Sequence, residues 1–435
     1  MKWIELQKSA PLSGSVQIQG SKNSSLALLA AACLADEPVV LKGVPDIYDY
    51  RAICDIVSGV GVEIRRTPEQ DVYIDPRHIS SGELDLQKTS TFRASYYFVG
   101  SLLAKQRKVK IGYPGGDNFV SRPIDQHIKV WKAFGAEVVL KENYYEVSAD
   151  KLSGADVYFD MITSGATINA LLVAALAQGK TTLRNTAKDP EVVDAANFLN
   201  QMGAKISGAG TDTIRIQGVD HLGGCTYRAI PDRLIAGAFF MAAGITGGSI
   251  TVEEIIPEHL ETTIMKLQEI GMEFDVQDTK IISYGDVNLR ATRVRTGMYP
   301  SFATDLQQPL TPLLLKAQGR SIITEKVFPQ RFAHVEQLQR MGANIEIKGS
   351  SAFIQGGSPL IGTLVHASDV RAGTALILAG LMAEGKTYIT GVEHIERGYE
   401  NLVASFSSLG AKIMMNVDDD LLELQNEQMC LIKNV

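Results

Sequence analysis

Phe134-Gly135-Ala136-Glu137-Val138 is one copy of a five-residue pattern that decides how this chain is organised. The pattern is an apolar residue, glycine, a small or apolar residue, a polar residue and a residue common in strands. Neighbouring copies lie 68 to 74 residues apart, with their glycines at Gly61, Gly135, Gly203, Gly271, Gly342 and Gly410. Chance rarely gives six copies so evenly spaced, and each predicts a helix that ends on a left-handed glycine before a strand.

A second shared element precedes these copies. Ala174–Asn185 (AALAQGKTTLRN) and Leu381–Gly391 (LMAEGKTYITG) both predict an apolar helix, a turn and a strand, as does Leu315–Glu325. Each repeat therefore holds about two helices and several strands, which predicts an α/β fold of six units. Three units per domain give one domain at residues 22–230 and a second at 1–21 plus 231–435. The segment Leu12–Gln19 is expected to pair as a strand with the C-terminal half.

Composition excludes several classes of protein. The net charge of −7 disfavours nucleic acid and anionic membranes as partners. We see no apolar run near the roughly 20 residues of a membrane span, no signal peptide and no GxxxxGK[ST] phosphate loop. Neither CxxC nor HExxH is present, so we expect no metal and no cofactor. The scattered cysteines indicate a reducing, cytoplasmic setting: Cys33, Cys54, Cys225 and Cys430.

Cationic residues recur where helices are expected to start. A single such cation is usually only solvated. Repetition at matching points of several repeats instead predicts one shared pocket for a multiply anionic ligand, because helix N-termini and guanidiniums both favour anions. The residues are Lys22, Arg93, Arg122, Arg371 and Arg397.

Ten motifs, in order along Leu12–Ile413, resemble those of the enolpyruvyl transferases. They are GSKNSS around Lys22, FRAS around Arg93, PGGD followed by SRPIDQH around Arg122, TSGAT at 163–167, DPEVVDAANFL at 189–199, PDR at 231–233, ATDLQ around Asp305, QRFAH around Arg331, SDVRAG around Arg371 and ERGYE around Arg397. The SRPIDQH motif is typical of the branch that uses a uridine sugar nucleotide, and less so of the branch that uses shikimate 3-phosphate.

The resemblance implies a two-domain inside-out α/β barrel, with buried helices and an active site in the interdomain cleft. It also implies a reaction. The carboxyvinyl group of phosphoenolpyruvate would move to the 3-hydroxyl of UDP-N-acetylglucosamine, with release of phosphate. This is the first committed step of peptidoglycan synthesis. The substrates are small molecules, and we expect a monomer or a weak homo-oligomer.

Site residues also follow from the resemblance. Phosphoenolpyruvate would be bound by Lys22, Arg93, Arg122, Arg331, Arg371 and Arg397. The nucleotide sugar would be held by Asn23, Arg93, Arg122, Pro123, Ile124, Asp125, Thr163, Ser164, Gly165, Asp305 and Val327. Asp305 would act as general base and Asp117 as general acid, with Lys22 and Arg397 stabilising charge in the transition state.

The chain departs from the family at several positions. Asp117 stands where the family usually has cysteine, so the thiolate that the epoxide fosfomycin alkylates is missing and resistance is expected. Other departures lie near the acceptor residues, at Tyr48, Ile235, Ala303 and Pro329-Gln330. They leave two alternatives open. The chain could transfer to another uridine nucleotide or anionic acceptor, or it could be a non-catalytic regulatory paralogue that binds a sugar nucleotide.

Overall fold

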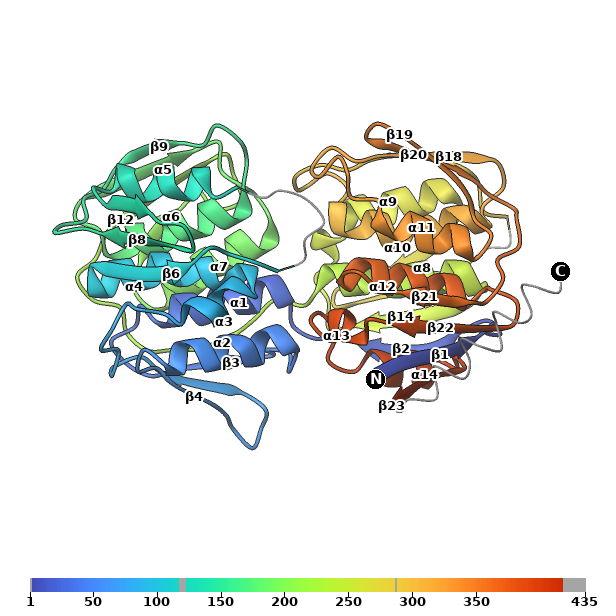
Figure 1. The fold of residues 1–435 in the computed structure, drawn as a ribbon, viewed down its shortest axis with the longest axis horizontal. Helices are drawn as coiled ribbons and strands as arrows, with labels where there is room; N and C mark the ends of the chain where they lie inside the picture. The colour runs from blue at the N-terminus through green and yellow to red at the C-terminus, as the bar shows by residue number, and fades with distance from the viewer. Residues whose placement is uncertain (1, 117–122, 286–287, 418–435) are drawn as a thin grey trace. The chain divides into compact units, whose positions relative to one another are not determined.

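The chain folds into two compact units, shown in Figure 1. The computed structural model describes residues 2–116, 123–285 and 288–417. The Lys22 unit comprises Gln19–Asp232 with Met298–Pro300, and the Asp305 unit comprises Met1–Ile18, Arg233–Gly297 and Ser301–Val435. None of the helices within the described ranges has the length and apolarity that crossing a membrane requires.

Each unit is built around three buried helices. They are α1 (Lys22–Ala32), α4 (Tyr97–Gln106) and α6 (Ser164–Leu176) in the Lys22 unit, and α8 (Arg233–Thr246), α10 (Thr304–Lys316) and α12 (Val370–Gly380) in the Asp305 unit. Every residue of α12 is buried, as are Gly165–Ala175 of α6. A helix that is apolar all round must be enclosed, and here the sheets enclose it (Figure 1).

Three sheets form the outside of the Lys22 unit. The first runs in the order β13 (Thr226–Arg228), β3 (Val39–Lys42), β5 (Val72–Asp75) and β4 (Glu63–Arg66). The second is β6 (Lys108–Gly112), β8 (Tyr144–Ser148) and β7 (Glu137–Leu140). The third is β11 (Lys205–Ser207), β12 (Thr213–Gln217), β10 (Lys180–Arg184) and β9 (Asp156–Tyr158).

The Asp305 unit also has three sheets, and two of them take a strand from the chain's beginning. The orders are β15 (Glu273–Val276), β16 (Lys280–Tyr284), β14 (Ser249–Glu253), β2 (Ser13–Gln17); then β17 (Arg293–Arg295), β18 (Arg320–Thr324), β20 (Ser351–Gln355), β19 (Asn344–Lys348); then β21 (Leu364–His366), β22 (Lys386–Thr390), β1 (Lys2–Gln7), β23 (Ile413–Val417). The expected strand at 12–19 is thus β2, which pairs in parallel with β14. A second N-terminal strand, β1, was not predicted and lies between β22 and β23.

All six pattern glycines have positive φ, between 94° and 116°. In every repeat an outer helix ends before the glycine and a strand begins just after it, as predicted. These helices are α2 (Tyr48–Ser58), α5 (Asp125–Ala133), α7 (Pro190–Gln201), α9 (Glu261–Ile270), α11 (Ala333–Arg340) and α14 (Leu402–Ser408). Short helical turns complete the chain at α3 (Leu86–Ser90), η1 (Arg93–Tyr96), η2 (Pro257–His259) and α13 (Val392–Ile395).

The helix start expected at Arg93 is found, because Arg93 opens η1, which continues directly into α4 at Tyr97. The helix start expected at Arg397 is wrong. Arg397 follows the end of α13, where the segment turns and α14 starts only at Leu402. The helix start expected at Lys22 is found, because Lys22 is the first residue of α1 and the Ser21 hydroxyl caps the helix by accepting from the N–H of Ser24.

Candidate active site

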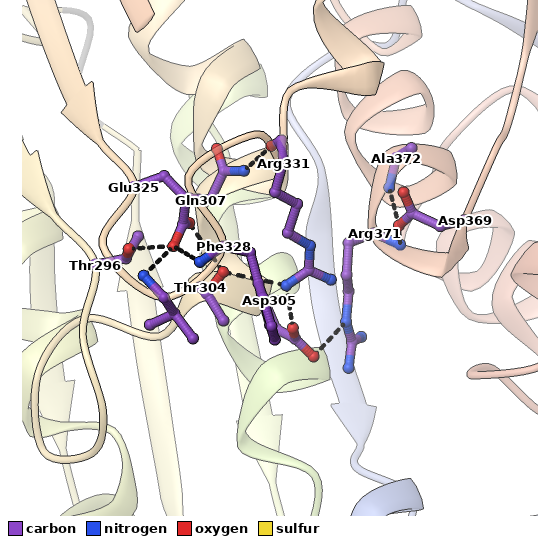
Figure 2. Close-up of polar contacts among 11 residues, drawn as sticks. Thr296, Thr304, Asp305, Gln307, Glu325, Phe328, Arg331, Asp369, Arg371 and Ala372 are labelled. Carbon is purple, nitrogen blue, oxygen red and sulfur yellow. Dashed lines mark hydrogen bonds and ion pairs between the residues drawn. The ribbon is translucent and has the colours of Figure 1, made fainter. Parts of the chain in front are cut away.

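Asp305, Arg331 and Arg371 form a charged cluster in the Asp305 unit (Figure 2). Asp305 lies in the first turn of α10, Arg331 precedes α11 and Arg371 lies in the first turn of α12. Arg331 Nη1 is 2.5 Å from Asp305 Oδ1, and Arg371 Nε is 3.3 Å from Asp305 Oδ2. The arginine side chains are only 5% and 7% exposed, whereas that of Asp305 is 27% exposed. Two buried cations therefore share one partly accessible carboxylate.

The cluster sets the charge of Asp305. Burial alone would raise the pKa of this carboxyl, but the Arg331 and Arg371 guanidiniums outweigh burial and hold the pKa below its usual range. Asp305 is therefore ionised at neutral pH. It is also a weak proton acceptor while both guanidiniums face it, because a general base works best when its pKa lies near the working pH.

Neighbouring side chains hold the backbone at Arg331 and Arg371. The Asp369 carboxylate caps α12 by accepting from the N–H groups of Arg371 and Ala372, at 2.8 and 3.0 Å. Gln307 Nε2, one turn into α10, donates to the carbonyl oxygen of Arg331 at 2.6 Å. Both ends of the cluster are thus held by the starts of two buried helices that pack together.

Arg397 belongs to a segment that packs on the start of α12. A Cβ added to Gly398 would lie 2.5 Å from Val370 Cγ1, so only glycine lets the chain pass this close. Val370 directly precedes Arg371. The tertiary structure therefore brings the segment of Arg397 to the helix start that carries Arg371, although Arg397 itself starts no helix.

Lys22 is the cation of the first buried helix in the Lys22 unit. Its Nζ lies 2.7 Å from Asp49 Oδ2 in the first turn of α2, with side chains 13% and 3% exposed. Its backbone N–H donates to Asp232 Oδ2 at 3.1 Å. A buried carboxylate thus holds the Lys22 ammonium at the helix start, and the exposed Asn23 follows it.

Arg93, Gly165 and His127 gather around one tyrosine ring. The Arg93 guanidinium lies 5.4 Å from the centroid of the Tyr96 ring, and the His127 ring lies 4.5 Å from it. A Cβ on Gly165 would come within 2.6 Å of Tyr96 Oη, which explains glycine at the start of α6. Burial, with Arg93 nearby, lowers the pKa of His127 to about 3, so the imidazole is neutral and adds no charge here.

The remaining residues predicted to bind the nucleotide sugar lie at two helix starts and in one loop. Ile124 and Asp125 begin α5, with Pro123 exposed just before it. Thr163 and Ser164 begin α6, and Ser164 Oγ donates to Asp189 Oδ2 at 3.0 Å. Val327 lies in the loop after β18, where its N–H donates to Glu325. Asp117 and Arg122 lie outside the described residues.

Sequence reasoning missed two buried carboxylates of these clusters. Asp49 lies in the first turn of α2, where an acidic residue is common because it interacts favourably with the helix dipole. Its position in the sequence therefore did not indicate a partner for Lys22. Glu325 was read only as the end of an apolar strand segment. Its one signal is an acid that directly follows the alternating strand Arg320–Thr324, at a position that is completely buried.

Two of the sequence departures have local explanations. Pro329 occupies the second position of a turn that Arg331 N closes on Phe328 O at 2.9 Å, and proline is favoured there. Ala303 precedes α10 in extended conformation, and its side chain makes no capping hydrogen bond. Instead, the N–H of Leu306 donates to the carbonyl oxygen of Ala303 at 3.0 Å. Tyr48 is 62% exposed at the start of α2, and nothing in the structure explains its identity.

An α/β protein whose buried helices carry cations in their first turns suits small, multiply charged anions. The sequence matches the family described as EPSP synthase (3-phosphoshikimate 1-carboxyvinyltransferase) over residues 6–406. The chain belongs to this family of enolpyruvyl transferases, which confirms the resemblance and the predicted fold.

Relatives cover nearly the whole chain. A protein of Listeria monocytogenes named UDP-N-acetylglucosamine 1-carboxyvinyltransferase 2 is 47% identical over 408 residues, which is 94% of this chain and 96% of the relative. One of Bacillus anthracis with the same name is 44% identical over 413 residues, covering 95% and 96%. The UDP-N-acetylglucosamine 1-carboxyvinyltransferase of Clostridium botulinum is 44% identical over 415 residues, covering 95% and 100%.

Solved structures share the fold. The enolpyruvyl transferase NikO from Streptomyces tendae superposes with a TM-score of 0.86 at 24% identity, covering 96% of this chain and 99% of that one. EPSP synthase from Acinetobacter baumannii gives 0.71 at 18% identity, covering 96% and 100%. The family match and the relatives at 44% to 47% identity, rather than these structures, show that the protein is an enzyme of the transferase class.

Proposed function

We propose that this enzyme transfers the enolpyruvyl group of phosphoenolpyruvate to the 3-hydroxyl of UDP-N-acetylglucosamine and releases phosphate, the first committed step of peptidoglycan synthesis. The observation that carries the proposal is the shared name of relatives 44% to 47% identical over at least 94% of the chain. The paired cations of the Asp305 cluster support it, because both substrates are anionic.

The proposed mechanism assigns residues of both units to one reaction. Asp305 accepts the proton of the acceptor hydroxyl as the hydroxyl oxygen attacks C2 of phosphoenolpyruvate. Asp117 gives a proton to C3. A proton then returns from C3 to the ionised Asp117 carboxylate while the C2–O bond to phosphate breaks, which restores the vinyl group. Lys22, Arg331, Arg371 and Arg397, with Arg93 and Arg122, offset the anionic charge throughout.

The Asp305 cluster gives the proposal a further physical step. Arg331 and Arg371 hold the pKa of Asp305 low while they face it. When the phosphate or carboxylate of phosphoenolpyruvate takes over part of their charge, the pKa of Asp305 rises and the carboxylate becomes a better base. Binding of the donor substrate would thus prepare Asp305 for the acceptor hydroxyl.

Phosphate release from phosphoenolpyruvate tests the function with three acceptors in parallel: UDP-N-acetylglucosamine, UMP and shikimate 3-phosphate. Turnover with the first alone is expected. Turnover only with another acceptor would keep the mechanism and replace the pathway. No turnover with any acceptor, from protein that still binds a sugar nucleotide, would show a regulatory paralogue.

A further inference from the structure

Glu325 is a buried carboxylate one residue beyond β18, with no exposed surface. Its Oε1 accepts from Thr296 Oγ1 at 2.6 Å and from the N–H groups of Val327 and Phe328 at 2.8 and 3.0 Å. Its Oε2 accepts from Thr304 Oγ1 at 2.9 Å. Figure 2 shows these bonds reaching the Asp305 cluster through Thr304.

The direction of both threonine protons is fixed by other donors. Lys326 N donates to Thr296 Oγ1 at 2.9 Å, and Arg331 Nη1 donates to Thr304 Oγ1 at 3.2 Å. An amide N–H and a guanidinium can only donate, so each hydroxyl must turn its own proton toward Glu325. Four donors therefore converge on Glu325, which fits an acceptor-only carboxylate. A neutral amide at this position would oppose one of them.

We propose that Glu325 is a positioning residue for the enolpyruvyl transfer. By accepting the Thr304 proton, it turns the Thr304 oxygen toward Arg331 and so holds the Arg331 guanidinium against Asp305. The inference rests on the proposed function for its catalytic consequence. Its geometric part concerns only contacts within the Asp305 unit.

Burial explains why Glu325 acts through other residues. A side chain with no exposed surface touches no substrate, whereas the Asp305 carboxylate is 27% exposed. Burying a carboxylate is costly unless hydrogen bonds replace its water. Here the bonds join three places that must keep register: the strand end at Thr296, the loop at Val327 and Phe328, and the start of α10 at Thr304.

Thr304 offers a substitution pair and Thr296 a matched control. Thr304→Val removes the oxygen that Arg331 uses, and Thr304→Ser keeps it. Thr296→Val removes a donor to the same carboxylate, at Oε1 of Glu325. Among the bonds described, Thr296 makes none to Arg331. Glu325→Gln keeps the shape and places an amide nitrogen against one donor. That nitrogen is expected to face Thr304, because three donors occupy the other oxygen.

The test measures kcat and KM for phosphoenolpyruvate with UDP-N-acetylglucosamine, together with thermal stability. Thr304→Val and Glu325→Gln are each expected to lower kcat/KM about 10-fold, and the double variant no further. Thr304→Ser should restore most of the rate. Thr296→Val should stay within about two-fold of the parent despite a similar loss of Tm. Equal rates for Thr304→Val and Thr296→Val at matched stability would overturn the proposal, as would failure of Thr304→Ser to rescue.

Crystal structures separate this inference from the proposed function. Thr304→Val should show the Arg331 guanidinium displaced from Asp305, and Thr304→Ser should show it in place. If the parent enzyme used another acceptor, the proposed function would be wrong. The position of Arg331 in Thr304→Val, and the dissociation constant of that variant for phosphoenolpyruvate, would still test the role of Glu325. An unmoved Arg331 in Thr304→Val would reject the positioning role whatever the acceptor.

Discussion

The Asp305 carboxylate pairs with both Arg331 and Arg371, so its charge affects stability as well as chemistry. Its folded pKa is lowered, which means the ionised form is favoured in the folded state. The stabilisation is then fully present above the unfolded pKa of about 4 and is lost as pH falls through the lower folded pKa.

Asp305→Asn should therefore reduce the free energy of unfolding by about 2 kcal/mol at pH 7 and by less at pH 3. Urea unfolding of parent and variant at both pH values checks this, with the exposed Asp278→Asn as control. A loss of the same size at pH 3 and pH 7 would show that the charge of Asp305 is not what stabilises the cluster.

Asp117, which stands where the family usually has cysteine, leads to a second prediction. Fosfomycin inactivates by alkylation, in which a thiolate opens the epoxide and forms a carbon–sulfur bond. Burial raises the pKa of Cys33 to about 12 and that of Cys54 to about 11, so neither supplies a thiolate near neutral pH.

The parent enzyme should therefore keep its activity after preincubation with fosfomycin. Asp117→Cys should lose activity with time, with one adduct per chain by mass spectrometry. Time-dependent loss in the parent would contradict the prediction. Loss that dilution reverses would indicate competition with phosphoenolpyruvate and would leave the covalent prediction intact.

At the scale of elements, the pattern glycines end the outer helices. Gly203 after α7 has φ of 110° and is exposed, and a Cβ added there would have nothing within 4 Å. Its replacement therefore tests backbone conformation without a clash. The left-handed region costs an ordinary residue about 1 kcal/mol, and asparagine less than alanine.

Gly203→Ala should lower the free energy of unfolding by about 1 kcal/mol, and Gly203→Asn by less. Chemical denaturation at constant slope measures both, and enzymatic activity serves as the control. Equal stability of the alanine and asparagine variants would show that the positive φ at Gly203 does not limit the choice of residue.

At the scale of the whole molecule, the chain's beginning completes a sheet made from its end. Ile4 pairs with Ile389 of β22 on one side and with Met415 of β23 on the other. Leu6 is completely buried, and a Cβ on Gly380 of α12 would lie 2.6 Å from its Cδ1. Stability of the Asp305 unit should therefore depend on the first strand.

Leu6→Ala should cost about 3 kcal/mol through the cavity it leaves against α12. Hydrogen exchange should speed up in β22 and β23 but not in β10 and β12 of the Lys22 unit. Lys2→Ala, which removes only a half-exposed ion pair with Glu396, is the matched control. Faster exchange spread evenly over both units would contradict this division.

The repeats and the family motifs were readable from the sequence because local patterns carry them. A glycine between a helix and a strand indicates the left-handed cap that all six positions adopt. The motifs also identified Asp305, Arg331 and Arg371, which the structure brings together although 26 to 66 residues separate Asp305 from its partners. The ion pairs of Asp305 with Arg331 and Arg371, and their effect on the pKa of Asp305, could not be predicted from the sequence.

Local spacing along the chain was enough to predict the six repeats, the family and the residue types of the candidate site. The folded structure was needed to show that β1 pairs between β22 and β23, that Arg397 starts no helix, and that Glu325 and Asp49 lie buried beside the charged residues. Strand pairing across the chain and burial of a lone carboxylate depend on contacts between distant segments, and no short pattern records those.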